Sequence, residues 1–320
     1  MQKVIIILLI IAVVLVILYF CIGKYFYDFA INANTKKAFM EENPNLPPSE
    51  TGDLEETKKK EQLDKEFESL HKASEVTVIS KDKLSLRLNA YVYKQRKISN
   101  KWVILVHGYN NNAKSMIRWV RNFYEQGYNV LTPDLRGHGK SEGEYIGMGW
   151  HDRLDLLIWI DKVIELDPNA KIVLFGVSMG GATVMMASGE DLPPNVKVIV
   201  EDCGYTSAVD VFIYQLGVLF GLPKFPVMQA ANTVIKLKAG YDLNEASAIK
   251  QVAKSKTPIL FIHGDEDSFV PFKMLDELYH AAAAHKEKLI IKGAGHWIAE
   301  SVDKQLYWNT VWNFVNKYIQ

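Results

Sequence analysis

The sequence predicts an α/β protein with a mostly parallel, doubly wound sheet, a small helical cap insertion and an N-terminal transmembrane helix. Short continuous apolar runs, typical of strands that are buried on both faces, recur along the chain. Segments with helical periodicity separate these runs, which is the pattern of a parallel sheet covered by helices on both sides. A longer apolar stretch of membrane-spanning length precedes them.

The composition argues against several classes of function. Of the 320 residues 48% are hydrophobic, and 37 Lys and Arg balance 37 Asp and Glu, so nothing indicates a nucleic-acid partner. Cys21 and Cys203 lie far apart in dissimilar segments, so we expect no disulfide. No Cys/His spacing suits zinc and no glycine-rich loop suits a nucleotide, so we expect neither a metal nor a cofactor. The sequence indicates no oligomeric state.

The N-terminal apolar stretch, Val4–Ile22, has 19 residues and would span about 28 Å as a helix. A cleaved signal peptide is the alternative. No small residues at cleavage-site spacing follow, however, since the stretch continues directly into Phe20–Phe26. We therefore expect an uncleaved single-pass anchor in the cell membrane, with the lipid bilayer as a partner.

The charges around this anchor do not favour an inside N-terminus, because Lys3 precedes it whereas Lys24, Lys36 and Lys37 follow it. Large domains translocate largely regardless of such charges. We expect the folded domain on the extracytoplasmic side, as is the general habit of N-terminal anchors. We also expect a protein that starts near residue 34 to be soluble and active.

Residues 34–72 are polar and of mixed charge, and we interpret them as a linker or stalk. In the second half of this segment Leu63, Phe67 and Leu70 recur at helical spacing, which indicates a helix that docks on the domain.

The domain that follows, residues 73–320, carries the strand and helix pattern. Val76–Ser80 and Leu84–Tyr93 alternate apolar and polar residues, as in an antiparallel edge pair. The runs that predict buried strands are Trp102–Val106, Asn129–Thr132, Ile172–Phe175, Val196–Val200, Ile259–Ile262 and Leu289–Ile291. The main helical patterns are Ser115–Gln126, Leu154–Glu165, Met274–Ala284 and Lys304–Tyr318.

The alternation breaks at about residues 208–250. This segment is rich in aromatic and aliphatic residues, among them Phe212, Phe220 and Phe225. We interpret it as a helical cap over the carboxyl edge of the sheet, where it would roof a modest apolar pocket.

A serine lies just after the run Ile172–Phe175, in Gly176-Val-Ser-Met-Gly180, and helix-forming residues follow it. A strand, a sharp turn and a helix in this order lift the Ser178 hydroxyl out of the sheet. Such a turn is sterically strained, so we expect Gly176 and Gly180 to be required because neither position tolerates a Cβ.

Three further segments follow strands at the same edge, where the working residues of a doubly wound sheet lie. They are Val106–Asn110, His263–Pro271 and Gly293–Trp297. Together with the serine turn they supply Ser178, Asp267 and His296 in chain order. A serine hydroxyl becomes a nucleophile when a base takes its proton. His296 is the candidate base, and Asp267 would hold its tautomer and stabilise the imidazolium.

Five motifs occur in a characteristic order: His107-Gly108, Asp134–Ser141, Gly176–Gly181, Asp267–Pro271 and Gly295–Trp297. With them the chain resembles the α/β-hydrolases over about residues 72–320. Within that superfamily it is similar to bacterial membrane-anchored hydrolases of the serine aminopeptidase-like and Bem46-like kind. The resemblance selects Asp267 over Asp265, because the acid of this family stands three residues before Val-Pro.

An oxyanion hole needs donors that are fixed near the serine. The N–H of Met179, directly after Ser178, is one candidate. The resemblance implies that the N–H of Tyr109 is the other. We expect the cap to shape the pocket together with Tyr109, Asn110, Asn111 and Tyr205.

Other titratable residues at this edge remain as alternatives. His107 and His263 also end strands, but both precede a glycine in turns that the resembling family uses structurally. Asp202 ends the strand before the cap, where some lipases carry their acid. Asp134 and His138 are interpreted as residues that shape a loop.

The resemblance implies a serine hydrolase that cleaves ester-like bonds through an acyl-enzyme, and we expect an esterase of small to medium apolar acyl substrates. A peptidase of the prolyl or serine aminopeptidase kind is the alternative enzyme. The peptidase alternative is weakened because the cap has no cluster of acidic residues that could bind the amino terminus of a substrate. A dehalogenase is disfavoured by Ser178 in place of Asp, whereas a cofactor-free haloperoxidase would use the same triad. The third reading is a non-catalytic binding protein on this fold.

Overall fold

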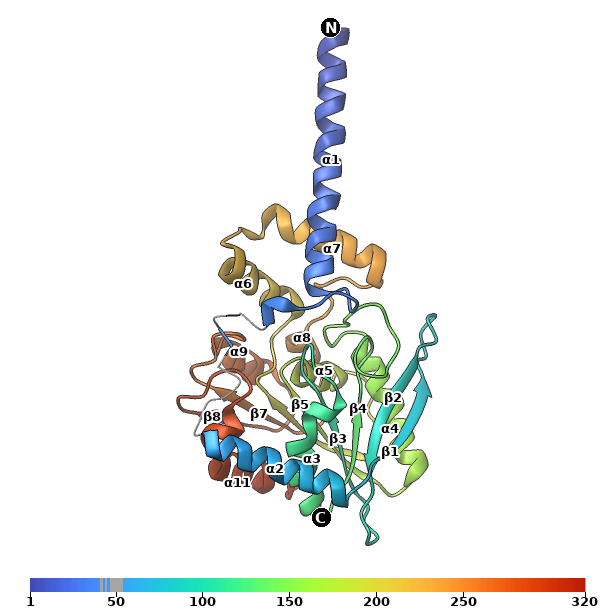
Figure 1. Cartoon of the computed structure of the whole chain (residues 1–320), viewed down its shortest axis with the longest axis vertical. Coiled ribbons are helices and arrows are strands. Elements are labelled where there is room, and N and C mark those ends of the chain that lie inside the picture. The colour runs from blue at the N-terminus through green and yellow to red at the C-terminus, as the bar shows by residue number, and fades with distance from the viewer. Residues whose placement is uncertain (41–42, 44, 47–53, 320) are drawn as a thin grey trace.

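The computed structural model describes residues 1–40, 43, 45–46 and 54–319, and the strands among them form one sheet (Figure 1). Its order is β1-β2-β4-β3-β5-β6-β7-β8. The strands are β1 Ser74–Ile79, β2 Arg87–Tyr93, β3 Lys101–Val106, β4 Asn129–Pro133, β5 Lys171–Val177, β6 Val196–Asp202, β7 Ile259–Gly264 and β8 Lys286–Ile291. Neighbours from β4 to β8 run parallel, whereas β1 and β2 pair antiparallel, so the predicted sheet is confirmed.

Most strand boundaries lie within two residues of the expected ones, and the starts of two strands differ by three. β2 begins at Arg87 and not at Leu84, because Ser85 has a φ of 48° and turns the chain, and the N–H of Leu86 donates to Ser80 Oγ. β8 begins at Lys286, three residues before the apolar run. An edge strand that is half exposed accommodates these charged side chains.

Helices cover both faces of the sheet, as expected. Val103 and Leu105 pack with α3 (Ile117–Glu125) and α11 (Lys304–Val315), whereas Trp102, Ile104 and Val106 belong to the opposite core. That opposite core is covered by α4 (Asp152–Leu166), α5 (Met179–Ala187), α8 (Ala248–Val252) and α9 (Lys273–Ala281). The alternation along β3 therefore separates two apolar cores on the two faces of the sheet.

The four predicted helices are present with shifted bounds. α4 begins two residues earlier and ends one residue later than expected. The segment expected as one helix over Ser115–Gln126 begins as the short helix η2 (Ala113–Met116), which Asn112 caps by accepting from the N–H of Lys114, and continues as α3. α9 ends at Ala281 and α11 at Val315, each three residues earlier than the pattern predicts. Periodicity alone does not mark these ends, since polar and small residues continue past them.

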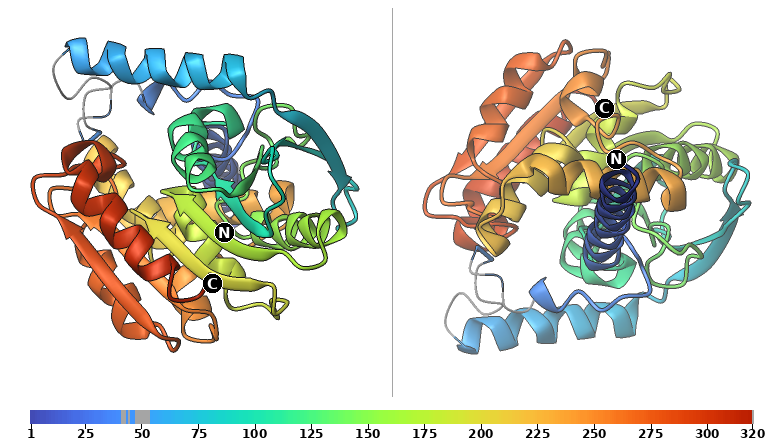
Figure 2. Two further views of the ribbon diagram at one scale, coloured as in Figure 1. Left: turned by 90° about the horizontal axis from the view of Figure 1, so that it is seen from below. Right: turned by 90° about the horizontal axis from the view of Figure 1, so that it is seen from above.

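Part of the predicted linker, residues 41–42, 44 and 47–53, lies outside the described residues. Its second half forms α2 (Leu54–Leu70), which lies at the outside of the molecule against α3 (Figure 2). Phe67 is buried in the core, and Asp64 pairs with Arg121 at 2.9 Å. Leu63 and Leu70 are exposed. Of the three apolar residues predicted to dock the helix, Phe67 does so, and the ion pair of Asp64 with Arg121 adds a second contact.

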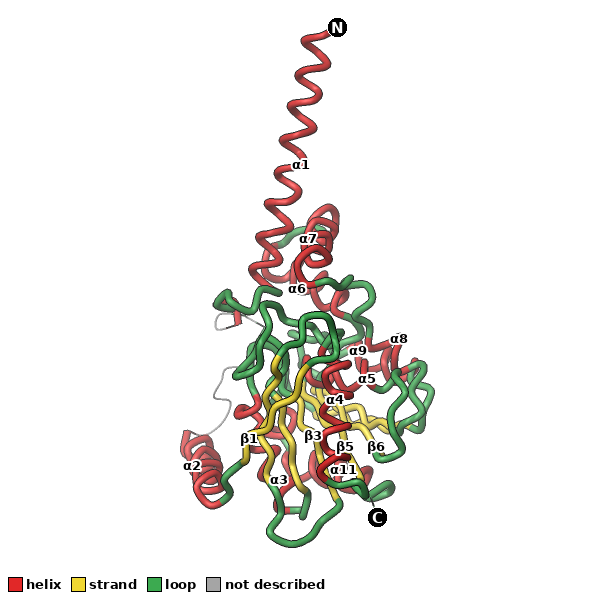
Figure 3. The backbone as a smooth tube through the Cα atoms, turned by 90° about the vertical axis from the view of Figure 1, so that its right-hand side faces the viewer, coloured by secondary structure: helices red, strands yellow, loops and turns green. Residues whose placement is uncertain are grey.

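The N-terminal helix α1 spans Gln2–Ala30 and continues past the predicted membrane span into the folded domain (Figures 1 and 3). Its outer part is exposed and apolar, and it is long enough to cross a membrane. From Tyr19 onward it packs against the cap helix α7 (Lys224–Ala239), with the Tyr19 hydroxyl 2.8 Å from Thr233 Oγ1. Tyr27 and Ile31 are buried in the main core. A protein that starts near residue 34 would therefore lack buried contacts of the domain, which speaks against the expectation that it is soluble and active.

The close approach of α1 and α7 depends on a glycine. A Cβ built on Gly23 would lie 2.3 Å from the carbonyl oxygen of Ala230, so only glycine fits where the helices cross. Viewed from above, α1 stands end-on beside α7 (Figure 2).

The cap consists of α6 (Ala208–Phe220) and α7, which lie between the free part of α1 and the sheet (Figure 3). α8 follows α7 but packs against α5 and α9 in the layer that covers the sheet. The cap is therefore shorter at its carboxyl end than the expected 208–250.

Candidate active site

Ser178 occupies the turn between β5 and α5. Its backbone has a φ of 56° and a ψ of −118°, a strained conformation for a residue with a Cβ. The turn is held from both sides, since the N–H of Ser178 donates to the Asp202 carbonyl at 2.7 Å and its own carbonyl accepts from Ala182. The hydroxyl is thereby fixed at the carboxyl edge of the sheet.

Gly176 and Gly180 flank this turn where backbones touch. A Cβ on Gly176 would lie 2.1 Å from the Gly180 carbonyl oxygen, and a Cβ on Gly180 would lie 2.0 Å from the Val106 carbonyl oxygen. Real Cβ contacts are essentially never under 3.0 Å, so both positions exclude every side chain. The requirement arises from close packing of main chains and not from a positive φ at the glycines.

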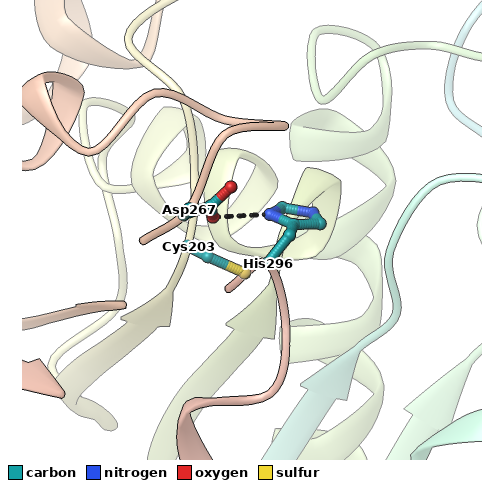
Figure 4. Close-up of side chains that lie close together, drawn as sticks. All are labelled: Cys203, Asp267 and His296. Carbon is teal, nitrogen blue, oxygen red and sulfur yellow. Dashed lines mark hydrogen bonds and ion pairs between the residues drawn. The ribbon is translucent and has the colours of Figure 1, made fainter. Parts of the chain in front are cut away.

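The structure brings Ser178, His296 and Asp267 together. Ser178 Oγ lies 2.8 Å from His296 Nε2. On the other side of the ring, His296 Nδ1 lies 2.7 Å from Asp267 Oδ2, as Figure 4 shows. Asp267 comes from the loop after β7 and His296 from the loop after β8, and all three side chains are buried. With Nδ1–H donating to the carboxylate, Nε2 is free to accept the serine proton, as a general base must.

Asp267 is held in one orientation by four donors. Oδ1 accepts from the N–H groups of Phe269 and Val270, each at 2.9 Å, and Oδ2 accepts from His296 and from His263 Nε2 at 3.2 Å. Burial by itself would raise the pKa of Asp267. The charge of His296 and the hydrogen bonds of His263 and His296 outweigh burial and hold that pKa below its usual range. The carboxylate therefore stays ionised beside the imidazole.

His263 is the residue whose contact with Asp267 the sequence reasoning missed. Its Nε2 lies 3.0 Å from the Val270 carbonyl and 3.2 Å from Asp267 Oδ2, so it buttresses the acid from behind. Burial would lower the pKa of His263, but the hydrogen bond to Asp267 raises it. Its position four residues before Asp267 was visible in the sequence, but only the folded turn makes the two side chains meet.

The other titratable residues have structural partners. Asp202 accepts from the Tyr307 hydroxyl at 2.7 Å, and Asp265 accepts from the N–H of Gly293. His107 contacts the Gly108 carbonyl through Nδ1 and accepts from the N–H of Leu135 through Nε2. Asp134 accepts from the N–H groups of Ala113 and Lys140, and His138 contacts the Arg136 carbonyl. These contacts agree with the structural interpretation of His107, Asp134 and His138, and they give the alternative acids Asp202 and Asp265 partners other than His296.

The two candidate oxyanion donors lie on either side of Ser178. Met179 is the first residue of α5, where helix N–H groups lack partners in the helix. A Cβ on Gly108 would lie 3.4 Å from Ser178 Cβ, so the loop that carries Tyr109 passes directly beside the nucleophile. This placement is compatible with the expected role of both main-chain groups. The side chain of Tyr109 adds an unexpected contact, since its hydroxyl donates to the Ala30 carbonyl at 2.7 Å.

An apolar pocket adjoins Ser178. Phe212, Phe220, Tyr109 and Tyr205 contribute to its lining as expected, whereas Asn110 and Asn111 do not. Phe225 does not line it either and is 68% exposed, because the backbone at Phe225 is non-helical and α7 is kinked there. The full lining is Phe26, Phe29, Ala30, Phe39, Tyr109, Met148, Ser178, Met179, Tyr205, Val211, Phe212, Gln215, Leu216, Leu219, Phe220, Met228, Ala231, Ile235, Phe269 and Val270.

One group of potential metal ligands overlaps this site. Ligand atoms of Cys203, Asp267 and His296 lie within 4.8 Å of one another (Figure 4). Both nitrogens of His296 already have partners, in Asp267 and Ser178. Burial, and after it the charges of nearby Asp202 and Asp267, raise the pKa of Cys203, so it stays a thiol and not the thiolate that binds metals. The group fits a hydrogen-bonded triad better than a metal centre.

A protein family and several known proteins are similar to this chain. Residues 98–201 match the family described as Serine aminopeptidase, S33; this segment includes Ser178 but ends before Asp267. The uncharacterized protein YqkD of Bacillus subtilis is 27% identical over 219 residues, which is 67% of this chain and 70% of that protein. Curated relatives from Escherichia coli and Arabidopsis thaliana are matched over 62 and 61% of their own lengths.

Two solved structures show the likeness in three dimensions. The esterase Pf2001 of Pyrococcus furiosus has a TM-score of 0.64 at 22% identity, covering 86% of this chain and 98% of the esterase. The acylaminoacyl peptidase of Pyrococcus horikoshii has a TM-score of 0.57 at 16% identity, covering 78% of this chain and 42% of the peptidase. These likenesses show a fold shared with esterases and peptidases, and with the family match they support a hydrolase.

Proposed function

We propose that this chain, which has the α/β-hydrolase fold, is a membrane-anchored serine hydrolase that cleaves esters of small to medium apolar acyl groups. The observation that carries this proposal is the hydrogen-bonded series from Ser178 through His296 to Asp267 beside an apolar pocket. A buried base that contacts both a serine hydroxyl and an ionised carboxylate is suited to nucleophilic catalysis.

In the first half-reaction Ser178 Oγ attacks the ester carbonyl carbon while His296 Nε2 takes the hydroxyl proton. The carbonyl electron pair moves to the oxygen, and the N–H groups of Met179 and Tyr109 would stabilise that oxyanion. When the pair returns, the bond to the leaving alcohol breaks and His296 gives its proton to the alcohol oxygen. The products of this step are the free alcohol and an acyl group on Ser178.

In the second half-reaction water attacks the acyl carbon. His296 takes a proton from this water, and the tetrahedral intermediate collapses by releasing Ser178 Oγ, which regains the proton. The products are a carboxylic acid and the free enzyme. Asp267 remains ionised throughout and stabilises the imidazolium in both steps.

The lining of the pocket favours an ester over an aminopeptidase substrate. No Asp, Glu, Lys or Arg side chain is among the described residues that line it. A free substrate ammonium would therefore lose its hydration without gaining a carboxylate partner, which is costly. A peptidase acting on substrates without a charged end group remains the alternative.

The membrane anchor of the proposal is supported by how α1 ends. Cleavage of a signal peptide after residue 22 would cut the continuous helix Gln2–Ala30 and would remove Tyr19, whose hydroxyl lies 2.8 Å from Thr233 Oγ1 of the cap. We further propose that the domain faces the extracytoplasmic side. A membrane-impermeant fluorophosphonate should then label intact cells, whereas labelling only after lysis would place the domain inside.

A fluorophosphonate probe tests the enzyme itself. Full-length protein should be labelled at Ser178, and Ser178→Ala should abolish labelling. Asp202→Asn is the matched control, since Asp202 is equally buried at the same edge but hydrogen bonds to Tyr307 and not to His296. Folded wild-type protein that resists labelling and hydrolyses no p-nitrophenyl ester would indicate the non-catalytic alternative.

A further inference from the structure

The anchor helix forms a wall of the pocket. Phe26, Phe29 and Ala30 of α1 line the same cavity as Ser178. The ring of Phe220 from α6 packs edge-to-face on Phe26 at 5.3 Å and on Phe29 at 5.2 Å between centroids. The helix that would hold the protein in the bilayer is thus one side of the proposed acyl site.

The pocket therefore begins close to the bilayer core. If the hydrocarbon core is crossed by Val4–Ile22, Phe26 lies about 6 Å further along the helix and Ala30 about 12 Å. The headgroup layer on each side of that core is about 5–8 Å thick. The wall formed by Phe26 is accordingly at headgroup depth, and Ala30 is just beyond it.

The cap has the surface expected at that depth. Apolar side chains on α7 and on the turn before it are exposed, with Leu222 at 40%, Phe225 at 68% and Leu237 at 72%. Lys224 and Lys238 on α7 are also exposed. Exposed apolar and basic side chains together are typical of surfaces that lie in a membrane interface. Because α7 packs on α1 from Tyr19 onward, the cap has no freedom to stand away from the bilayer.

From these observations we infer that the substrate is an amphiphilic ester with a single acyl chain that resides in the bilayer and enters the pocket from the membrane side. This inference rests on the proposed function. An apolar chain would leave the lipid for a lining that is apolar and uncharged, so its transfer costs little. The ester group would follow the chain into the pocket, whose lining includes Ser178 as well as Phe26 and Phe29 of α1. The lining encloses one cavity beside Ser178, which suits one chain.

The test uses full-length protein in phosphatidylcholine vesicles, with monodecanoylglycerol in the vesicles and p-nitrophenyl acetate in the water. Wild type should hydrolyse monodecanoylglycerol with a kcat/KM at least tenfold above that for monobutyrylglycerol, since each buried methylene contributes about fourfold. In Phe26→Ala and Phe29→Ala the ratio of the kcat/KM for monodecanoylglycerol to that for p-nitrophenyl acetate should fall about tenfold.

One exposed aromatic residue of α1 provides the matched control. Phe20→Ala removes a ring that does not line the pocket, so it should change the ratio less than twofold. If the alanine variants lose fluorophosphonate labelling, Phe26→Leu and Phe29→Leu are measured in their place. The comparison of decanoyl and butyryl esters on wild type tests the inference without any variant.

The outcomes separate the inference from the proposed function. Hydrolysis of p-nitrophenyl acetate with no preference for the decanoyl over the butyryl ester would overturn the membrane substrate and leave the serine hydrolase intact. An unchanged ratio in the Phe26 and Phe29 variants would do the same. Absence of Ser178 labelling and of all ester hydrolysis would instead overturn the hydrolase.

Discussion

The Tyr109 hydroxyl donates a hydrogen bond of 2.7 Å to the main-chain carbonyl of Ala30. This contact joins the loop that is expected to supply an oxyanion donor to the last residue of the anchor helix. Carbonyls in the last turn of a helix have no partner within the helix, so the hydroxyl satisfies a group that would otherwise be buried without one.

Tyr109→Phe should therefore weaken the docking of α1. Loss of one such hydrogen bond costs about 1 kcal/mol, which corresponds to a Tm lower by about 2–4 °C in a domain of this size. Tyr214→Phe is the matched control, because its hydroxyl also donates to a main-chain carbonyl, that of Ser268, but at an exposed site. Equal Tm values for wild type and Tyr109→Phe would show that the bond adds no net stability.

The triad makes a kinetic prediction. Ser178→Ala and His296→Ala should each lower kcat by about 10⁶, and the double variant should be no worse than either, because the residues act as one unit. Asp267→Asn should cost about 10⁴ by favouring the wrong histidine tautomer. Steady-state hydrolysis of a p-nitrophenyl ester measures all three. A near-normal kcat for Asp267→Asn would refute the acid assignment.

The serine turn makes a prediction about stability. Gly176→Val and Gly180→Val would each place side-chain atoms within about 2 Å of a main-chain carbonyl, so neither variant should yield folded, labelled protein. Gly217→Ala in α6 is the control, since its Cβ meets nothing within 4 Å; it should be neutral or stabilise by up to about 1 kcal/mol. Thermal unfolding and fluorophosphonate labelling distinguish the two valine variants from the Gly217→Ala control. Normal labelling of either valine variant would contradict the close packing of main chains at the turn.

The dependence of the domain on α1 is tested by two truncations. Removal of residues 1–18 deletes only the exposed part of the helix, so the protein should become soluble and keep Ser178 labelling. Removal of residues 1–33 also deletes the buried Tyr27 and Ile31, each worth about 1.5–3 kcal/mol, together with the pocket wall. That protein should aggregate or lose labelling. Full labelling of the shorter protein would show that the domain folds without α1.

The sequence predicted the sheet and placed Ser178, Asp267 and His296 at one edge from where apolar runs end, and the family resemblance then selected Asp267 over Asp265. Strand ends in a parallel sheet converge at one edge, so residues distant in sequence are placed together without knowledge of side-chain packing. The structure places these three side chains in one hydrogen-bonded series.

The docking of α1 and the orientation of Phe225 were not predictable in the same way. A helix that is apolar on all sides has the same pattern whether lipid or protein covers it, and Gly23 was the one local sign of a close contact. Phe225 belongs to an aromatic-rich segment, but composition does not reveal that a non-helical residue at the start of α7 points its ring outward. The contact between His263 and Asp267 likewise depends on the path of a loop.

A buried acid that the proposed mechanism does not use makes the last prediction. Glu201 on β6 is fully buried, and among the described residues its Oε1 has no hydrogen-bond partner. Burial raises the pKa of Glu201 to about 8, although the charge of His263 and the N–H of Gly204 act in the opposite direction. In the unfolded chain a glutamate ionises near pH 4.3.

Between these two pH values the folded protein binds a proton that the unfolded chain has lost, so stability falls as pH rises, by up to about 1.4 kcal/mol per pH unit. Above about pH 8 Glu201 is ionised in both the folded and the unfolded state, so stability no longer depends on its titration.

Glu201→Gln should reduce the fall in Tm between pH 6 and 8. Asp152→Asn is the control, because burial raises the pKa of Asp152 only to about 6, so its effect should lie below pH 6. The raised pKa of His263 also makes stability fall as pH rises, so the difference in slope between wild type and Glu201→Gln is the quantity to measure. Identical slopes between pH 6 and 8 would show that Glu201 is already ionised in the folded protein.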